Sequence, residues 1–274
     1  MRLGVVPKLS SREAIELAGN IVHYAESLGV NTLMDHRVKP VEGWGTFRLG
    51  VDTVDVVIVV GGDGTVLSTL HALRDTDTPI ATIRHGKRGF LCDVPPFEYR
   101  TMIRRLVEGN YVIHEYMRLS ATAGTEELPP ALNDYSIVTN GPSRSKVGRL
   151  NVTKDGEEIF NIVGDGLIIA PPVGSTAYAL AAGGPVVDPL MEAIILAPLA
   201  PAMLCSRPVV LPPSSEVKIT VRFDSPPLEL MVDGQVSATL QPGDEIIIRK
   251  ADKPAKILRF FTGDHYVKLF SRCM

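Results

Sequence analysis

The strongest constraint on the fold lies at residues 54–65, where an apolar run ends in a glycine-rich turn, VDVVIVVGGDGT. Its β-branched residues are typical of a strand buried on both faces, and a helical pattern follows at 66–73. Glycines at such a turn let backbone approach a ligand, and the helix N-terminus offers N–H groups to an anion. A phosphate fits this turn. The Asp63 carboxylate would repel it unless a metal or a proton intervenes, and a helix cap is the other interpretation of Asp63.

The composition limits the class of protein. The 274 residues suffice for one large or two ordinary domains, and the net charge of −3 gives no basic surface for nucleic acid. The three cysteines (Cys92, Cys205 and Cys273) lack metal-site spacing, which favours a reducing cytosol and small buried side chains. Neither a signal peptide nor an apolar run of transmembrane length is found. We therefore expect a soluble cytoplasmic protein that binds neither nucleic acid nor a membrane.

Residues 1–112 predict an α/β domain. Their opening β-α-β pattern, with Ser10 or Ser11 as helix cap, favours a parallel sheet with a right-handed crossover. Residues 36–53, which include Trp44, are irregular and form either a loop over a site or plain surface chain. The segment His85–Leu91 follows a strand, where loops gather around a ligand. The expected strands lie at 3–6, 31–34, 54–60 and 79–84, and the expected helices at 13–28, 66–73 and 97–108.

Residues 113–253 predict a β-rich, sandwich-like domain, because short alternating runs bounded by turn residues replace the helical pattern. Asp155-Gly156 is a good hairpin signal, and one helix is expected at 175–182. The apolar stretch Leu190–Leu211 predicts either a subunit interface or a buried helix. The expected strands lie at 118–123, 135–139, 149–154, 166–170, 217–223 and 245–249.

Three further motifs carry chemistry. Asn133-Asp134 pairs an amide with a carboxylate, which together can grip a diol or a ribose, although such a pair is more often a turn. The stretch 164–185, GDGLIIAPPVGSTAYALAAGGP, runs from a strand through small residues into a helix. Small residues let a planar ring lie close to backbone, Ser175 and Thr176 can present hydroxyls, and Tyr178 can stack on a base; tight helix–sheet packing is the alternative. Val232–Gln235 contains Asp-Gly, an ordinary hairpin turn.

Together these motifs resemble the NAD kinase family. The match is ordered along the chain and spans roughly residues 54–250, and the stretch 164–185 is its most specific part. Gly-Gly-Asp-Gly alone also resembles diacylglycerol kinases, sphingosine kinases and phosphofructokinases. Neither the P-loop pattern nor the dinucleotide glycine fingerprint is present. The sequence departs from the family pattern at Val163, Val173, Ala181 and Ala202, and at Asp134, where most members have glutamate.

The resemblance implies phosphorylation of NAD at the 2′-hydroxyl of its adenosine ribose to give NADP. ATP or polyphosphate would be the donor, with Mg²⁺ or another divalent metal. Asp63 would be the catalytic base, and the backbone of Gly62, Gly64 and Thr65 would hold donor phosphates. It also implies a homodimer or homotetramer and the return of 254–274 to the first domain. The dinucleotide contacts that it implies are Asn133, Asp134, Lys146, Asp165, Thr176, Ala177, Tyr178, Ala181, Ala200 and Gln235.

Two rival functions stay open at this point. A lipid or sphingoid kinase would share Gly-Gly-Asp-Gly and a β-rich second domain, but should lack the stretch Gly174–Pro185. A catalytically silent dinucleotide-binding regulator would agree with the hydroxyls missing at Val173 and Ala181, but an intact Asp63 argues against it.

Overall fold

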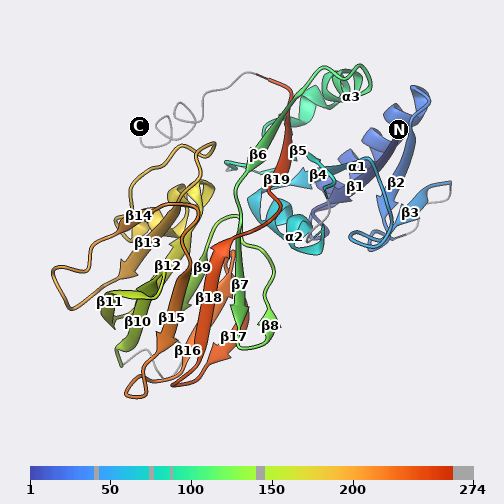
Figure 1. Ribbon diagram of the computed structural model, residues 1–274. Coiled ribbons are helices and arrows are strands. Elements are labelled where there is room, and N and C mark those ends of the chain that lie inside the picture. Colours follow the sequence, from blue (N-terminus) through green and yellow to red (C-terminus); the bar gives the residue numbers. More distant parts are fainter. Residues whose placement is uncertain (40–42, 74–76, 87–88, 140–145, 262–274) are drawn as a thin grey trace. The chain divides into compact units, whose positions relative to one another are not determined.

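The computed structural model (Figure 1) describes residues 1–39, 43–73, 77–86, 89–139 and 146–261. The chain divides into two compact units: Met1–Glu115 with Ala255–Met274, and Tyr116–Pro254. We call them the N-terminal and the C-terminal unit. The fold class is the expected one, since the first unit is α/β and the second is built of β-sheets. No helix in the described ranges is long and apolar enough to cross a membrane.

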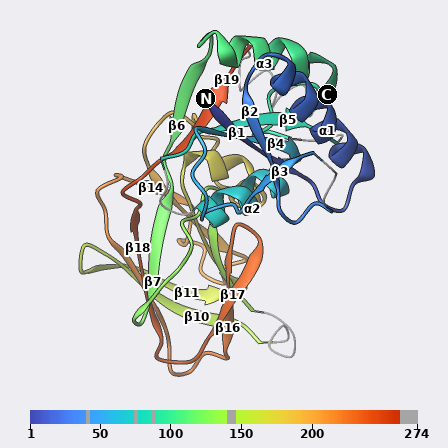
Figure 2. The same cartoon turned by 90° about the vertical axis from the view of Figure 1, so that its right-hand side faces the viewer.

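The N-terminal unit is a seven-stranded sheet with strand order β3-β2-β1-β4-β5-β19-β6. Strands β1 to β5 and β19 pair in parallel, as the β-α-β pattern predicted. Helices α1 and α3 pack together on one face of the sheet, and α2 lies on the other (Figure 2). The strands are β1 (Arg2–Pro7), β2 (Asn31–Asp35), β3 (Gly45–Phe47), β4 (Val56–Gly61), β5 (Ile80–Arg84), β6 (Val112–Tyr116) and β19 (Ala255–Arg259), and the helices are α1 (Arg12–Ser27), α2 (Asp63–Leu73) and α3 (Tyr99–Val107), the last preceded by a 3₁₀ turn at Pro96–Glu98.

Local chemistry explains α1. The Ser11 hydroxyl accepts the N–H of Ala14 and caps the helix, so the second of the two expected caps is the one used. Small side chains such as Ala14 and Ala18 recur on its buried face and let the helix lie close to the sheet. Trp44, in the segment 36–53, packs edge-on against His23 of the same helix. The segment also contains β3, a three-residue strand that the sequence pattern did not predict.

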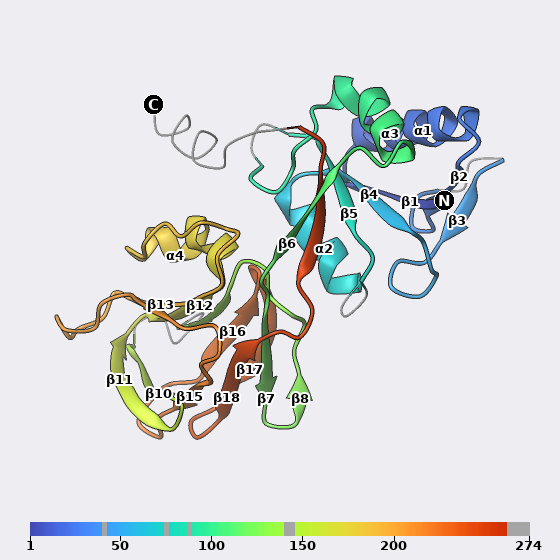
Figure 3. The ribbon, with the colours of Figure 1, turned by 45° about the horizontal axis from the view of Figure 1, so that its top comes forward.

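The C-terminal unit is a sandwich of two six-stranded antiparallel sheets, ordered β11-β10-β15-β18-β7-β8 and β14-β13-β12-β9-β16-β17. A core with side chains from both sheets lies between them. The outer face of the second sheet is covered at β12 and β13 by α4 (Figure 3), which explains why every residue of β12 is buried. The strands are β7 (Leu119–Ala123), β8 (Glu126–Glu127), β9 (Tyr135–Val138), β10 (Gly148–Lys154), β11 (Glu157–Gly164), β12 (Gly166–Ala170), β13 (Ile194–Leu199), β14 (Val209–Leu211), β15 (Val217–Val221), β16 (Leu228–Val232), β17 (Gln235–Leu240) and β18 (Glu245–Lys250), and α4 (Tyr178–Ala181) follows a 3₁₀ turn at Pro172–Thr176.

Two expectations for this unit were wrong in part. The helix expected at 175–182 is a 3₁₀ turn followed by a single helical turn, because Pro171 and Pro172 precede it and Gly183 ends it. The buried-helix alternative for Leu190–Leu211 is wrong, since this stretch contributes β13 and β14. The hairpin at Asp155-Gly156 is confirmed, with φ of 52° and 88°.

Candidate functional site

The glycine-rich turn lies where the order of the N-terminal sheet reverses. Successive strands run outward from β1 through β2 on one side and from β4 through β5 on the other, so β1 and β4 flank the reversal. Open α/β sheets bind ligands at the carboxyl ends of the strands at such a point. Gly62 and Thr65, just beyond β4, are partly exposed, and Gly64 is exposed in the first turn of α2. This end of the unit can therefore present helix N–H groups to an anion.

The carboxylate of Asp63 is already held by backbone. Its Oδ2 accepts the N–H of Phe90 at 2.7 Å and its Oδ1 accepts that of Leu91 at 3.0 Å. Asp63 is the first residue of α2. Its side chain accepts hydrogen bonds from the loop after β5 and does not cap its own helix. The Arg259 guanidinium of β19 donates to the Leu91 carbonyl at 3.0 Å and braces the same loop. Sequence reasoning missed Arg259, because the expected return of 254–274 did not say which strand β19 would pair with.

Cys92 lies beneath this turn as a neutral thiol. Its Sγ donates to the Gly61 carbonyl at 3.4 Å. Burial, and after it the negative charge of Asp63, raises the pKa of the thiol to about 12. Cys92 is thus the small buried side chain that was expected. Cys205, in contrast, is exposed, and Cys273 lies outside the described residues.

His85 ties the loop after β5 to the start of α1. Its backbone N–H donates to Gly61 O at 2.8 Å, and its Nε2 lies 3.0 Å from the Ser11 hydroxyl. That hydroxyl donates to Glu13 Oε2 at 2.7 Å, so the shared bond requires His85 Nε2 to be the donor. Carboxyl ends of three strands therefore meet at the turn. Lys87 and Arg88 of the segment His85–Leu91 lie outside the described residues.

In the C-terminal unit, Asn133 and Asp134 precede β9 and are bound to the β16–β17 turn. The Asp233 carboxylate accepts the N–H of Leu132 (3.1 Å), Asn133 (2.7 Å) and Asp134 (3.0 Å). The segment 171–176 approaches from another direction, and a Cβ on Gly174 would lie only 1.6 Å from the Asn133 carbonyl oxygen. The structure thus brings together three motifs that are far apart in sequence.

Asp134 is a buried carboxyl, 5% exposed. Burial, and secondarily the charge of Asp233, raises its pKa from 3.8 to about 7. A carboxyl of this kind can donate a hydrogen bond when protonated and accept one when ionised, which suits it to a ligand hydroxyl. Asn133 is partly exposed.

The remaining candidate residues divide between two ends of β12. Antiparallel pairing places Tyr135 opposite Ile169 and Val138 opposite Gly166. Asn133 and Asp134 therefore lie at the carboxyl end of β12, about 13 Å along the strand from its first residue at a rise of about 3.3 Å per residue. The chain continues from that carboxyl end of β12 to Thr176, Ala177, Tyr178 and Ala181. Gln235 is the first residue of β17 and lies two positions after Asp233 in the chain.

Asp165 belongs to the opposite end of β12. It is exposed between β11 and β12, and its N–H donates to Leu199 O, next to Ala200. Ala200 is exposed and has a φ of 41°, a left-handed conformation uncommon outside glycine. Lys146 is exposed at the border of the described chain. The structure therefore does not bring Asp165 and Ala200 together with Asn133 and Asp134.

Exposure also separates side chains that can meet a ligand from those that cannot. Tyr178 is 44% exposed, and Thr176 and Ala177 are partly exposed. The Ser175 hydroxyl, which was expected to be presentable, is buried. It accepts the N–H of Val187 and donates to the carbonyl of the same residue, so it fixes the stretch 175–187 instead.

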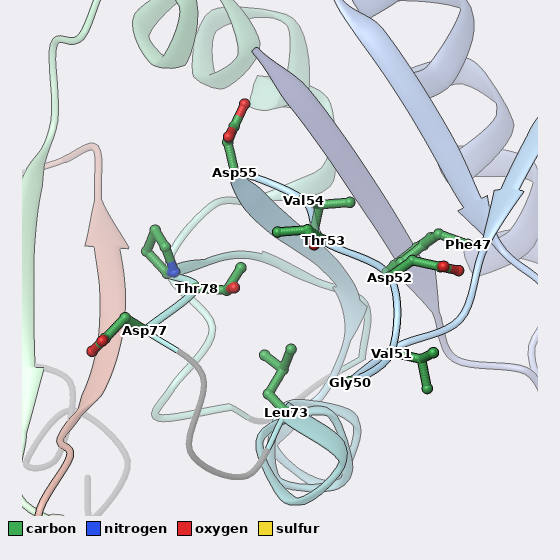
Figure 4. A pocket seen from close by; sticks show the side chains of 11 residues that line it. Phe47, Gly50, Val51, Asp52, Thr53, Val54, Asp55, Leu73, Asp77 and Thr78 are labelled. Carbon is green, nitrogen blue, oxygen red and sulfur yellow. The ribbon is translucent and has the colours of Figure 1, made fainter.

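A cavity of about 420 Å³ in the N-terminal unit (Figure 4) is not part of this site. Asp55 and Thr78, which line it, precede β4 and β5 and so lie at the amino ends of these strands. The glycine-rich turn follows the carboxyl end of β4. Among the described residues, no group of three or more His, Cys, Asp or Glu side chains could hold a metal ion.

Comparison with known proteins identifies the family. Residues 45–111 match the ATP-NAD kinase N-terminal domain and residues 132–260 match the ATP-NAD kinase C-terminal domain. The NAD kinase of Thermococcus gammatolerans is 38% identical over 265 residues, which are 95% of this chain and 94% of that protein. The chain belongs to the NAD kinase family.

Solved structures agree with this NAD kinase assignment. The crystal structure of an NAD kinase from Archaeoglobus fulgidus in complex with ATP has a TM-score of 0.79 and 28% identity, covering 99% of this chain and 98% of that one. Yeast NADH kinase complexed with NADH has a TM-score of 0.87 at 24% identity, covering 99% and 86%, and shares the fold. The resemblance stated from the motifs is therefore confirmed.

Proposed function

We propose that the chain transfers the terminal phosphoryl group of ATP to the 2′-hydroxyl on the adenosine ribose of NAD. As a member of the NAD kinase family it phosphorylates NAD to NADP, and near full-length similarity to curated NAD kinases carries this conclusion. The choice of ATP over polyphosphate is supported by the ATP complex of the Archaeoglobus fulgidus relative. The position of the phosphorylated hydroxyl follows from the resemblance of the motifs.

The turn Gly62–Thr65 would hold the donor phosphates. Its residues lie at a helix N-terminus at the reversal point of the sheet, where N–H groups and the helix dipole favour an anion. Divalent metal would enter as part of the substrate, as Mg²⁺ on the phosphates of ATP. Mg²⁺ in such sites binds chiefly phosphates and water.

The C-terminal unit would bind NAD. The partly exposed Asn133 would offer its amide to the hydroxyls of a ribose, and the buried Asp134 beside it is a further contact that the family resemblance supports. Tyr178, with its exposed ring, would stack on a base, beside Thr176 and Ala177. Gln235 and Ala181 are further dinucleotide contacts that the family resemblance supports.

Asp63 would accept the proton of the attacking 2′-hydroxyl. A hydroxyl is a poor nucleophile at neutral pH, and a positioned base contributes about 10²- to 10⁴-fold. The two N–H groups from Phe90 and Leu91 fix the orientation of the carboxylate, so its geometry exists before the substrates bind. Most of the acceleration in phosphoryl transfer comes from positioning and electrostatics.

We also propose that the chain works as a homodimer or homotetramer. Asp165 and Ala200 lie at the other end of β12 from Asn133, so they would serve NAD bound by a second copy. Exposed apolar side chains on the same stretch of chain, 190–210, support an interface there. They are Leu190, Met191, Met203, Leu204 and Val210. Light scattering that gives a monomer at working concentration would contradict this assembly.

One assay tests the function against its rivals. The protein is incubated with ATP, Mg²⁺ and NAD, and NADP is detected with an NADP-specific dehydrogenase; Asp63→Asn protein serves as the control. Formation of NADP by the parent chain is the expected result. NAD binding without product would indicate the silent regulator, and phosphorylation of a sphingoid base or a diacylglycerol instead of NAD would indicate the lipid kinase.

A further inference from the structure

Asp233 does more than make a turn. The β16–β17 hairpin has φ of 49° at Asp233 and 77° at Gly234, which is ordinary for an Asp-Gly turn. Such a turn usually leaves the carboxylate in water, but Asp233 is only 8% exposed. We propose that Asp233 is a positioning residue for NAD, which acts by fixing the backbone that carries Asn133 and Asp134. The inference rests on the proposed function and names a residue through which that site is built.

Three consecutive amides converge on this one carboxylate. Oδ1 accepts the N–H of Asn133 and of Asp134, and Oδ2 accepts that of Leu132. The Asp233 N–H donates in return to the Asp134 carbonyl at 2.9 Å. Hydrogen bonds to an ionised acceptor are roughly twice as strong as those between neutral groups. The segment Leu132–Asp134 is therefore held at every one of its amides.

Close packing also holds the segment. The space beside the Asn133 carbonyl is filled by backbone at Gly174, where no side chain fits. The Asp233 bonds and this packing together restrict the backbone that carries the Asn133 side chain. Ligand groups held in place before binding cost less entropy when the ligand arrives, so loss of the Asp233 bonds should weaken NAD specifically.

Asp155 offers a matched control in the same unit. It is also the first residue of an Asp-Gly hairpin turn, with φ of 52°, and Gly156 follows at 88°. Its carboxylate accepts one backbone N–H, from Glu216 at 2.8 Å, and pairs with Lys154 at the surface. The turn conformation therefore does not require three amides on the carboxylate. Asparagine tolerates the left-handed conformation in both turns.

The first test is steady-state kinetics of Asp233→Asn and Asp155→Asn. An amide has one acceptor oxygen, and its NH₂ group would face a backbone N–H, so Asp233→Asn should raise the KM for NAD about 10-fold or more. The KM for ATP should stay within 2-fold, and Asp155→Asn should change neither. An unchanged KM for NAD in active Asp233→Asn protein would show that Asp233 serves only the turn and does not position NAD. A parent chain that makes no NADP would instead defeat the proposed function.

A double-mutant cycle separates positioning from a general loss of structure. If Asp233 acts through the segment at 132–134, Asp233→Asn should cost under about 3-fold in KM for NAD in an Asn133→Ala background, because coupled residues are not additive. Equal costs in both backgrounds would overturn the inference. If Asp233→Asn does not fold, amide hydrogen exchange of the unaltered enzyme tests whether the segment 132–134 is preformed. Slow exchange at Leu132, Asn133 and Asp134 without NAD is expected, and exchange at unprotected rates would refute the preformed segment.

Discussion

Replacement of Asp134 by asparagine should stabilise the fold by an amount that depends on pH. Burial of the carboxyl, with the nearby charge of Asp233, raises its pKa from 3.8 to about 7. Between these two values the folded protein holds a proton that the unfolded chain has lost. This contribution of Asp134 to stability is fully present below the unfolded pKa and is lost as pH rises through 7. Asparagine has no proton to lose, so its advantage grows over the same window.

The structure sets the size of the effect. A pKa difference of about 3 units at 1.36 kcal/mol per unit corresponds to about 4 kcal/mol between pH 4 and pH 7. Above pH 7 the difference should level off, because both states are then ionised. Because about one unit of this difference lies below pH 5, melts between pH 5 and pH 8 capture about 3 kcal/mol of it. At about 2–4 °C per kcal/mol for a chain of this size, the melting temperatures should diverge by roughly 5–10 °C over that range.

Thermal melts of the parent protein and Asp134→Asn at pH 5, 6, 7 and 8, without ligand, measure this divergence. Asp155→Asn is the control. Hydrogen bonds from Lys154 and from the Glu216 backbone lower the pKa of Asp155, so its titration lies below this pH range. The melting difference for Asp134→Asn should therefore rise from pH 5 to pH 7, while that for Asp155→Asn stays flat. A difference for Asp134→Asn that is equal at pH 5 and pH 8 would show that its carboxyl ionises at an ordinary pH, and the reasoning would fail.

Two further substitutions test the site. Asp63→Asn should lower kcat about 10²-fold or more with little change in NAD affinity, because it removes the proton acceptor. Kinetics at saturating NAD and ATP over a range of Mg²⁺ concentrations check this expectation. A near-normal kcat would mean that Asp63 has a structural role only. Gly174→Ala should lower the free energy of unfolding by about 3 kcal/mol and abolish most NAD binding, because the added Cβ would meet the Asn133 carbonyl oxygen. Urea denaturation measures the first effect and titration with NAD the second. A variant that binds NAD normally would contradict the close approach of Gly174 to Asn133.

Elements with a strong local signal could be predicted from sequence. The apolar run before the glycine turn is β4, and Ser11 caps α1 as the pattern indicated. Strand β3 could not be predicted, because three residues carry too little pattern and pair only in the finished sheet with β2. The exposure of Cys205 likewise follows from its loop and not from its residue type.

The residues of the candidate site could be predicted from the sequence, but their arrangement in space could not. Asp233 looked like a turn residue because its partners lie about 100 positions earlier in the chain. The separation of Asp165 from Asn133 is set by the pairing of β9 with β12, and register depends on packing that a local pattern does not contain. Family resemblance supplied both residues without saying that they lie at different ends of one strand.

Asp63 and Asp233 make the same kind of hydrogen bonds to backbone, and this changes how an asparagine variant of either residue must be interpreted. Each carboxylate accepts consecutive backbone N–H groups of another segment, Phe90 and Leu91 for Asp63 and the residues 132–134 for Asp233. Asp63→Asn therefore removes a proton acceptor and also disturbs a loop. Gly89→Ala separates the two effects, because its Cβ would lie 3.2 Å from Asp63 Oδ1 and crowd the same contact while the carboxylate remains. If the base is what matters, Gly89→Ala should keep far more of the kcat than Asp63→Asn. Equal losses would assign the effect of Asp63 to loop geometry alone.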